Sequence, residues 1–338
     1  MEADLVKRAG VPFTTIPAAG VHGVGWRALP GNLWRLWRGL LASRRILKRF
    51  RPDVLFFTGG YLAIPMAFAG RFPLGVYARP RSLVYVPDIE PGLALKTLAR
   101  FADRIAVTVD PSKAYFSRTD RVIETGYPTR PGLSTWTRAK AVEVLHLSKD
   151  IPILLVFGGS RGARSINQAL LGVLPDLLGD MQVIHISGKL DWSAVEENRK
   201  QLETDLPAEH MQRYRAYPYL HEEIGAAMAA ADLAVTRAGA SCLGEFPLFS
   251  LPAILVPYPH AWRYQTVNAQ YLEEHGAAVV VKDSDLPALL LSTVRRLIGD
   301  PQALSQMRSS MSALARPQAA ERIASLLSSL ATSGRGAA

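Results

Sequence analysis

The chain is poor in cysteine and has no long apolar run. Its single cysteine, Cys242, excludes an internal disulfide framework. No apolar run reaches the length of about eighteen residues that a membrane-spanning helix needs, and the first residues lack the basic-then-apolar order of a secretion signal. No group of His, Cys and acidic residues has the spacing of metal ligands, so no structural metal is expected. These absences predict a soluble protein or one that binds to a membrane surface.

Acidic residues are also missing between Asp4 and Asp53, where the sequence has ten lysines or arginines. Most of these lie in the predicted helix Leu33–Arg51, in which leucine and tryptophan recur at helical spacing between the basic residues. One interpretation is a helix that lies on an anionic membrane, with its tryptophans at headgroup depth. The other is an amphipathic helix that packs on a sheet and exposes a basic face. No nucleic-acid motif accompanies the charge, so no nucleic-acid partner is expected.

Short β-branched runs alternate with longer helical patterns, which predicts an α/β fold with parallel sheets. With 338 residues, 49% of them hydrophobic, the chain is long and apolar enough for two globular domains. The segment Tyr127–Thr137 has the composition of a linker between them. The predicted strands are Val54–Thr58, Leu83–Val86, Arg104–Val109, Arg121–Glu124, Ile153–Phe157, Gln182–Ile186, Leu233–Thr236, Ala253–Val256 and Ala278–Val281. The other predicted helices are Glu2–Ala9, Leu93–Phe101, Ser165–Leu178, Trp192–Glu203, Ile224–Ala231, Gly244–Phe249, Tyr264–His275 and Leu286–Ile298.

The segment after the predicted strand Ile153–Phe157 is the most informative part of the chain. It reads Gly158-Gly-Ser-Arg-Gly-Ala-Arg164 and leads into a helical pattern. Glycines allow the backbone to turn sharply and approach a ligand, and the start of a helix directs free N–H groups and the positive end of its dipole outward. Such a loop suits a phosphate or diphosphate, although it matches neither the P-loop nor the G-x-G-x-x-G fingerprint. An ordinary tight turn between strand and helix is the alternative.

Polar and glycine-rich segments also follow the later strands, at the edge where open α/β sheets bind ligands. The most prominent is Arg237–Glu245, a second strand–glycine–helix turn in which Glu245 is placed to reach a ribose. A solvated acid on the helix surface is the alternative for Glu245, and plain polar surface is the alternative for Gln265 and Asn268. Cys242 is expected to fill space in the core, because no histidine is placed to activate its thiol.

Segment 158–164 resembles the GGSQGAR motif of the MurG-type N-acetylglucosaminyltransferases of glycosyltransferase family 28, with Arg161 in place of glutamine. Further segments that resemble motifs of this family are Gly59–Tyr61, Gly126–Arg130, Ser187–Lys189, Arg237–Ala240, Glu245, Pro257–His260, Gln265, Asn268 and Ala320–Ile323. The resemblance implies a GT-B fold, in which two Rossmann-like domains with parallel sheets face each other across a cleft. It also implies an inverting enzyme that transfers GlcNAc from UDP-GlcNAc to a lipid-linked muramyl-peptide acceptor in peptidoglycan synthesis, with no cofactor.

The resemblance implies donor-binding roles for Arg130, Gly159, Ser160, Leu220, His221, Gly239, Ser241, Cys242, Glu245, Gln265 and Asn268. The uracil would lie by Leu220 and His221, and Glu245 would bind the ribose hydroxyls. Ser160, Arg130 and the N–H groups of residues 241–242 would hold the diphosphate. Gln265 and Asn268 would contact the sugar. Gly59, Gly60 and Tyr61 would lie on the side of the polyprenyl-diphosphate-linked acceptor.

The chain departs from the family at several positions. Family members begin earlier, with a strand and a glycine loop that carries the proposed general base, so the first strands of the N-terminal domain are expected to be missing. The family's HEQN segment is replaced by Tyr85–Asp88, which leaves Asp88 and Glu90 as candidate bases. Cys242 replaces a threonine, and Tyr264 replaces the first of two glutamines. The functional alternatives are a related UDP-sugar transferase with another lipid acceptor and a non-catalytic UDP-binding relative.

The implied organisation has three parts. Residues 1–132 would form an incomplete N-terminal domain that faces the acceptor and the membrane, and residues 133–318 the UDP-sugar donor domain. Residues 319–338 would form a C-terminal helix and tail. The implied location is cytoplasmic, peripheral on the inner face of the cell membrane, with Leu33–Arg51 in the region that touches the anionic surface.

Overall fold

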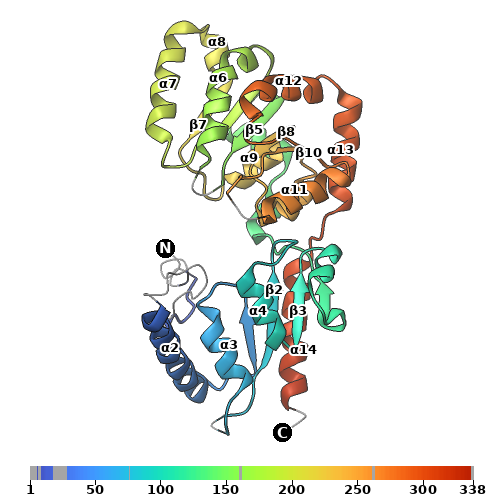
Figure 1. Cartoon of the computed structure of the whole chain (residues 1–338). Helices are drawn as coiled ribbons and strands as arrows, with labels where there is room; N and C mark the ends of the chain where they lie inside the picture. Colours follow the sequence, from blue (N-terminus) through green and yellow to red (C-terminus); the bar gives the residue numbers. More distant parts are fainter. Residues whose placement is uncertain are drawn as a thin grey trace.

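The computed structural model describes residues 6, 9–17, 29–75, 77–159, 162–260 and 263–335. These residues form two sheets in which every strand pair is parallel. The sheets lie at opposite ends of the molecule, and the chain crosses between them twice (Figure 1). The predicted parallel α/β architecture is confirmed.

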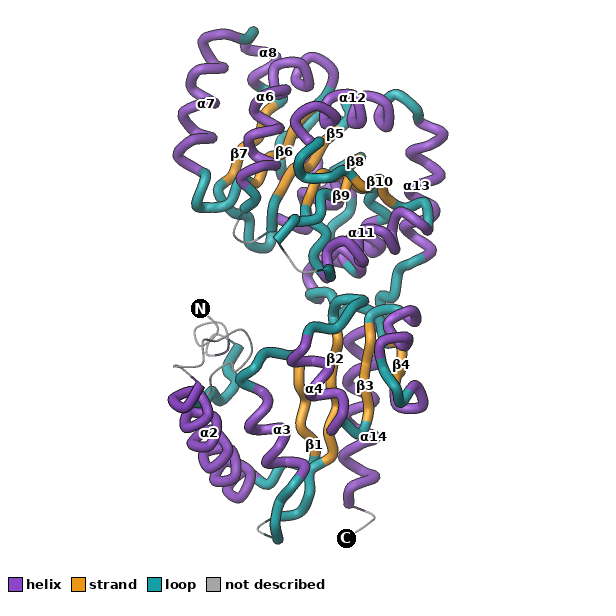
Figure 2. The backbone as a smooth tube through the Cα atoms, viewed as in Figure 1, coloured by secondary structure: helices purple, strands orange, loops and turns teal. Residues whose placement is uncertain are grey.

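The N-terminal sheet has four strands in chain order. Its strands are β1 (Val54–Phe57), β2 (Arg81–Val86), β3 (Arg104–Val107) and β4 (Val122–Glu124). The helices beside it are α2 (Leu29–Phe50), α3 (Ala63–Arg71), α4 (Leu93–Phe101) and α14 (Ala319–Arg335), with 3-10 turns η1 (Asp110–Tyr115) and η2 (Thr119–Arg121). The turn η3 (Pro131–Thr135) packs on α9 (Ile224–Ala230) of the C-terminal half. Side chains of β2 alternate between its faces, so Val84 belongs to the core with Leu98 of α4, and Tyr85 to the core with Ile323 of α14. The last helix of the chain thus covers the second face of the first sheet (Figure 2).

Helix α2 packs on α3 rather than on a sheet. Its buried side carries Gly39, Ser43 and Leu47, which are spaced by four residues and therefore share one face. The tryptophans lie elsewhere, and Trp34 and Trp37 are 58% and 51% exposed. The interpretation of a helix packed on a sheet is therefore wrong, and an apolar surface stays open beside the basic one.

The C-terminal sheet has six strands in the order β10-β9-β8-β5-β6-β7. The chain moves from β5 outward to β7, returns to β8 on the other side of β5, and continues outward to β10. The strand order therefore reverses between β5 and β8, the position at which open α/β sheets bind ligands. The strands are β5 (Ile153–Phe157), β6 (Gln182–Ile186), β7 (Tyr214–Tyr217), β8 (Leu233–Thr236), β9 (Ala253–Leu255) and β10 (Ala278–Val280). The helices are α5 (Arg138–Val144), α6 (Arg164–Asp180), α7 (Trp192–Asp205), α8 (Ala208–Met211), α9 (Ile224–Ala230), η4 (Ala240–Leu243), α10 (Glu245–Phe249), α11 (Tyr264–Glu274), α12 (Leu286–Ile298) and α13 (Pro301–Ala313).

The predicted strands end within two residues of observed ones, because the central strands are buried on both faces. In β5, Ile153 and Leu155 belong to the core on one side of the sheet, and Leu154 and Val156 to the core on the other. Strand β7 is missed, since it lies at the sheet edge and three of its four residues are only half-buried. Helices α3, α5, α8 and α13 are also missed. The predicted helix Glu2–Ala9 lies almost entirely outside the described residues.

No helix in the described part of the chain is both long and apolar enough to cross a membrane.

Candidate active site

A cavity of about 960 Å³ opens at the carboxyl edge of the C-terminal sheet. Its walls are the loop after β5, the first turn of α6, the segment after β8 that includes η4, and the loop after β9. These walls surround the point at which the strand order reverses. A cavity of this size accommodates a nucleotide-sized molecule.

The loop after β5 depends on glycine at three positions. Gly159 and Gly162 have φ angles of 85° and 79°, which residues with a side chain rarely adopt. A Cβ atom on Gly162 would collide with the carbonyl oxygen of Ser187, and one on Gly158 with the backbone of Ala163. The loop is therefore folded tightly on itself and against the loop after β6.

Helix α6 begins directly behind this loop. Its N-cap residue, Ala163, offers no side-chain acceptor to the first N–H groups, and its first turn contains no acidic residue. Those N–H groups and the positive end of the helix dipole are thus available to an anion. Arg164, the first helical residue, lines the same cavity. This geometry favours the phosphate-binding interpretation of the loop over an ordinary tight turn.

An arginine network in the cavity wall contains residues to which the sequence assigns no binding role, although Arg237 belongs to one of the motifs. Arg237, just after β8, donates to Ser165 Oγ (2.7 Å) and to the carbonyl oxygen of Val256 (3.1 Å). It also forms an ion pair with Asp283, and its side chain is only 10% exposed. Ser165 donates to the same carboxylate at 2.7 Å. The network fixes the first turn of α6 against the segments after β8 and β10. Arg237 and Asp283 each follow a predicted strand, and this position is the sequence signal that would identify them.

A fully buried histidine supports α6 from behind. His185 Nδ1 lies 2.8 Å from Tyr214 Oη, and its Nε2 lies 3.0 Å from Asn167 Oδ1. The amide of Asn167 donates to the carbonyl oxygen of Ser187 and to Asp191 Oδ2, both at 2.9 Å. Burial lowers the pKa of His185 to about 4, against a smaller opposite effect of Asp191. The imidazole is therefore neutral at pH 7, and the network serves as a brace for α6.

Two predicted donor residues meet beside the cavity. Glu245 Oε1 lies 3.6 Å from Arg130 Nη2, with the carboxylate 13% exposed and the arginine 59% exposed. Burial raises the pKa of Glu245, and Arg130 acts in the opposite direction. The alternative of a solvated surface acid is therefore wrong for Glu245.

Gly159, Gly239, Ser241 and Cys242 line the cavity. The N–H of Cys242 already donates to the carbonyl oxygen of Gly239 at 3.0 Å, so an anion would have to share that donor. The thiol is buried in the core, which raises its pKa. The expectation that Cys242 fills space is confirmed.

Helix α11 holds two residues predicted to contact the sugar. Gln265 lines the cavity, and its Oε1 accepts from the N–H of Tyr258 at 2.8 Å. Asn268 is fully buried. Its Nδ2 donates to Asp88 Oδ1 (2.9 Å) and to the carbonyl oxygen of Ala238 (3.2 Å).

The Oδ1 of Asn268 accepts from the N–H of Ile89 at 3.1 Å. Every polar atom of the amide is thus engaged, so the expectation of polar surface is wrong. Asn268 thus ties the donor side to the end of β2, and its contact with the sugar stays a prediction.

The candidate bases Asp88 and Glu90 follow β2 and face α11. Burial raises the pKa of Asp88, and the hydrogen bond from Asn268 lowers it. The carboxylate of Glu90 lies 3.5 Å from Lys96 Nζ and 3.9 Å from Arg263 Nε. Neither acid is part of the cavity lining, so a role as general base stays a prediction.

The remaining predicted residues lie away from the cavity lining or outside the described residues. Leu220 and His221 follow β7, where the ring of His221 meets Tyr219 edge-on with centroids 4.7 Å apart. Their contact with uracil stays a prediction. Ser160 lies outside the described residues.

The acceptor-side residues follow β1 at the carboxyl edge of the N-terminal sheet. Gly59 and Gly60 have φ angles of 117° and 81°, and Tyr61 is 38% exposed. This glycine turn is compatible with close approach of a ligand, and its role stays a prediction. Within the described ranges, no group of three or more His, Cys, Asp or Glu side chains is arranged to hold a metal ion.

The two sheets and the cavity at the strand reversal define a two-domain α/β protein of the nucleotide-binding type. Residues 153–323 match the glycosyltransferase family 28 C-terminal domain, and residues 1–107 match the glycosyltransferase family 28 N-terminal domain. The chain therefore belongs to glycosyltransferase family 28.

Known relatives resemble the chain over nearly its whole length. It is 38% identical to the UDP-N-acetylglucosamine–N-acetylmuramyl-(pentapeptide) pyrophosphoryl-undecaprenol N-acetylglucosamine transferase of Roseiflexus sp. (strain RS-1), over 98% of this chain and 81% of the relative. The protein of the same name from Desulforudis audaxviator (strain MP104C) is 37% identical, over 99% of this chain and 88% of the relative. Among solved structures, Acinetobacter baumannii MurG aligns with a TM-score of 0.73 at 26% identity, covering 97% of this chain and 88% of that one. The predicted family and its fold of two parallel-sheet domains are confirmed.

The raised pKa of Asp88 predicts a pH dependence of stability. Because the folded state holds the proton more tightly than the unfolded state, the contribution of Asp88 to stability is highest below the ordinary aspartate pKa and falls as the pH rises from about 4. Asp88→Asn keeps an oxygen acceptor for Asn268 but removes this titration. We expect the melting temperature of Asp88→Asn, relative to the wild type, to increase between about pH 4 and about pH 7. The exposed Asp176→Asn is the control, and equal pH profiles for both variants would contradict the prediction.

Proposed function

We propose that this chain is an inverting glycosyltransferase that transfers GlcNAc from UDP-GlcNAc to a lipid-linked muramyl-pentapeptide. The names of the relatives, which the chain matches over nearly its whole length, support the donor and the acceptor. The observation that carries the proposal is the cavity at the strand reversal, with the uncapped start of α6 behind its glycine loop.

The proposed position of UDP-GlcNAc follows from the protein groups that can bind its phosphates and its hydroxyls. The diphosphate lies against the glycine loop and the first N–H groups of α6, where a helix start attracts negative charge. Glu245 then accepts hydrogen bonds from the ribose, and its buried carboxylate is suited to this because an ionised acceptor forms the stronger hydrogen bond. Gln265 also lines the cavity and would contact the sugar.

In the proposed reaction, an acceptor hydroxyl attacks the anomeric carbon while the bond from this carbon to the diphosphate oxygen breaks. The hydroxyl proton passes to a base, and UDP leaves with additional negative charge. The N–H groups of α6, its dipole and Arg130 stabilise this developing charge from fixed positions. The acceptor enters from the side of Gly59–Tyr61, where Asp88 and Glu90 are the candidate bases.

We also propose that the N-terminal half binds to an anionic membrane surface. Trp34 and Trp37 of α2 stack with ring centroids 5.1 Å apart and are exposed. Apolar side chains on α3 and after it are also exposed, and Phe68, Phe72 and Leu74 are 42%, 38% and 70% accessible. Tryptophans at headgroup depth next to lysines and arginines are typical of a surface-bound helix.

The donor site is tested by UDP titration of Glu245→Gln. We expect the Kd for UDP to rise about tenfold, because a hydrogen bond to a charged group contributes about 1.5–3 kcal/mol. The exposed Glu274→Gln is the charge-matched control. The wild type should bind 2′,3′-dideoxy-UDP, which lacks the ribose hydroxyls, as weakly as Glu245→Gln binds UDP. Glu245→Gln should bind UDP and the dideoxy nucleotide with equal affinity. Equal UDP affinities of wild type and Glu245→Gln would remove Glu245 from the site.

The reaction is tested by incubating the chain with UDP-GlcNAc and either the lipid-linked muramyl-pentapeptide or diacylglycerol. We expect GlcNAc to appear on the muramyl acceptor with inverted anomeric configuration, and Glu245→Gln to lower kcat/KM about tenfold. Transfer to diacylglycerol alone would point to a different lipid acceptor. UDP binding without any transfer would point to a non-catalytic relative.

The membrane surface is tested by sedimentation with phosphatidylglycerol vesicles. We expect the double variant Trp34→Gln/Trp37→Gln to bind more than about tenfold more weakly, since burying one large apolar side chain contributes about 1.5–3 kcal/mol. The exposed Leu289→Gln, on α12, is the matched control. Unchanged vesicle binding of the double variant would exclude the tryptophan face as the docking surface.

A further inference from the structure

A second cavity lies in the N-terminal half, where one sheet crossover lacks a full helix. The connections from β1 to β2 and from β2 to β3 contain α3 and α4, but the connection from β3 to β4 consists of η1 and η2. Two short 3-10 turns thus stand in place of a full helix beside β3, whose residues Ile105 and Val107 are buried. A cavity of about 360 Å³ occupies this place, with Ala99 and Ile105 among its lining residues.

The lining of this cavity contains four cationic side chains and no carboxylate. The four are Lys96 and Arg100 from α4, and Arg118 and Arg121 from the connection. Two of them have acidic partners, since Lys96 Nζ lies 3.5 Å from Glu90 and Arg118 Nε lies 3.2 Å from Asp120. Arg100 and Arg121 form no ion pair with the described acids, and the exposed Asp120 acts on Arg121 only at longer range. The four cations of the lining thus share two nearby acids, Glu90 and Asp120.

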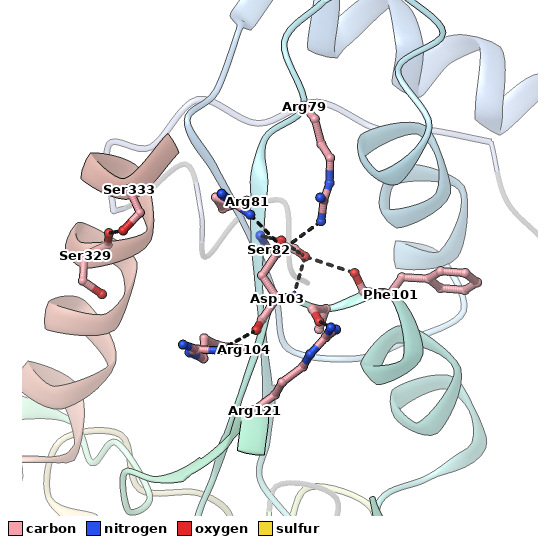
Figure 3. A network of polar contacts seen from close by, with 10 residues as sticks. Arg79, Arg81, Ser82, Phe101, Asp103, Arg104, Arg121, Ser329 and Ser333 are labelled. Carbon is pink, nitrogen blue, oxygen red and sulfur yellow. Dashed lines mark hydrogen bonds and ion pairs between the residues drawn. The ribbon is translucent and has the colours of Figure 1, made fainter. Parts of the chain in front are cut away.

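A second carboxylate near Arg121, that of Asp103, is already committed to other donors. Asp103 Oδ1 accepts from Arg79 (2.7 Å) and Arg81 (3.4 Å). Its Oδ2 accepts from the N–H (2.8 Å) and the hydroxyl (3.1 Å) of Ser82. Figure 3 shows this convergence, with Arg121 to one side of it. A carboxylate has about four acceptor sites, so Asp103 has none left for Arg121.

The guanidinium of Arg121 is nevertheless held in place. Its Nη1 donates to the carbonyl oxygen of Ala102 at 3.0 Å, which leaves the other donors of the guanidinium for a ligand. Lys96 Nζ, from α4, lies 5.5 Å from the ring centroid of Tyr115. Tyr115 and Phe116 add aromatic surface to the lining. The cavity thus combines cationic donors with an apolar wall.

We propose that this cavity binds an organic phosphate, with the phosphate between Arg100 and Arg121 and the carbon part of the ester on Tyr115 and Phe116. Arginines bind phosphate oxygens with two parallel N–H donors, and a cavity with an apolar wall selects an ester over the inorganic ion. The ligand is the headgroup of an anionic phospholipid or a soluble phosphate ester. The site is separate from the donor cavity, which lies in the other half of the molecule.

The experiment is calorimetric titration of the full chain, with saturating UDP present to occupy the donor cavity. The probes are dihexanoyl phosphatidylglycerol below its micelle concentration, glycerol 3-phosphate and inorganic phosphate. We expect at least one ester to bind the wild type, more tightly than inorganic phosphate. Arg100→Gln should weaken this binding about tenfold, the effect of losing one charge-assisted hydrogen bond. Arg100 is exposed and forms no hydrogen bond with the described residues, so this variant should fold.

Arg104→Gln is the matched control, because Arg104, on β3 of the N-terminal sheet, is an exposed arginine that lies outside the cavity lining. It should bind the esters as the wild type does. Binding of the lipid alone identifies a phospholipid headgroup as the ligand, and equal binding of glycerol 3-phosphate identifies a soluble ester. No binding by the wild type, equal binding by Arg100→Gln, or equal weakening by Arg104→Gln would overturn the proposal. None of these outcomes changes the UDP titration that tests the donor site.

Discussion

The reversal of strand order between β5 and β8 is the constraint on which the site depends. The loops that leave these two adjacent strands run to opposite sides of the sheet, so a cavity opens between them without any residue dedicated to keeping it open. No layer of helices is continuous across this point of the sheet. The hydrogen bonds and the ion pair of Arg237 connect its two sides instead. They join the segment after β8 to the first turn of α6 and to Asp283 after β10. The glycine loop is thereby held from both sides, since the His185 network supports the same helix from the side of β6 and β7.

The second sheet is positioned by contacts that lie far from the cavity. Helix α14 adds its apolar side to the N-terminal core after the chain has completed the C-terminal sheet. Arg316, just before α14, donates to Glu124 at the end of β4 (2.9 Å). Asn268 of α11 holds Asp88 and the N–H of Ile89 after β2. The carboxyl ends of strands in the N-terminal sheet are therefore tied to the donor half at two points, and both points join segments that are distant in sequence.

The distance in sequence between contacting residues explains which features of the structure can be predicted from the sequence and which cannot. The central strands are recognisable because burial on both faces gives continuous apolar runs such as Ile153–Phe157, and the glycine loop because only glycine tolerates its angles and contacts. The edge strand β7 lacks a continuous apolar run. The role of Asn268 has no local signal, since its partner Asp88 lies 180 residues away and its amide looks like any polar residue on a helix. The same limit applies to Ser165 and Asp283, which are 118 residues apart.

The distribution of ion pairs separates the two halves functionally. In the C-terminal half, arginines around the donor cavity are matched to acids of the same half: Arg237 to Asp283 and Arg164 to Asp191. An anion that enters this cavity therefore meets free helix N–H groups and arginines that are already paired with acids. Such an anion is held less tightly than by unpaired cations, which suits a ligand that must leave after each turnover. The N-terminal half has ion pairs of its own, such as Arg79 with Asp103 and Lys113 with Asp110. Its α2, however, has six basic residues and no acid, and Arg100 and Arg121 in the cavity beside α4 form no ion pair with the described acids. Unpaired charge is stable when water or an external anion solvates it, and the membrane and phosphate-ester proposals both assign such an anion to this half.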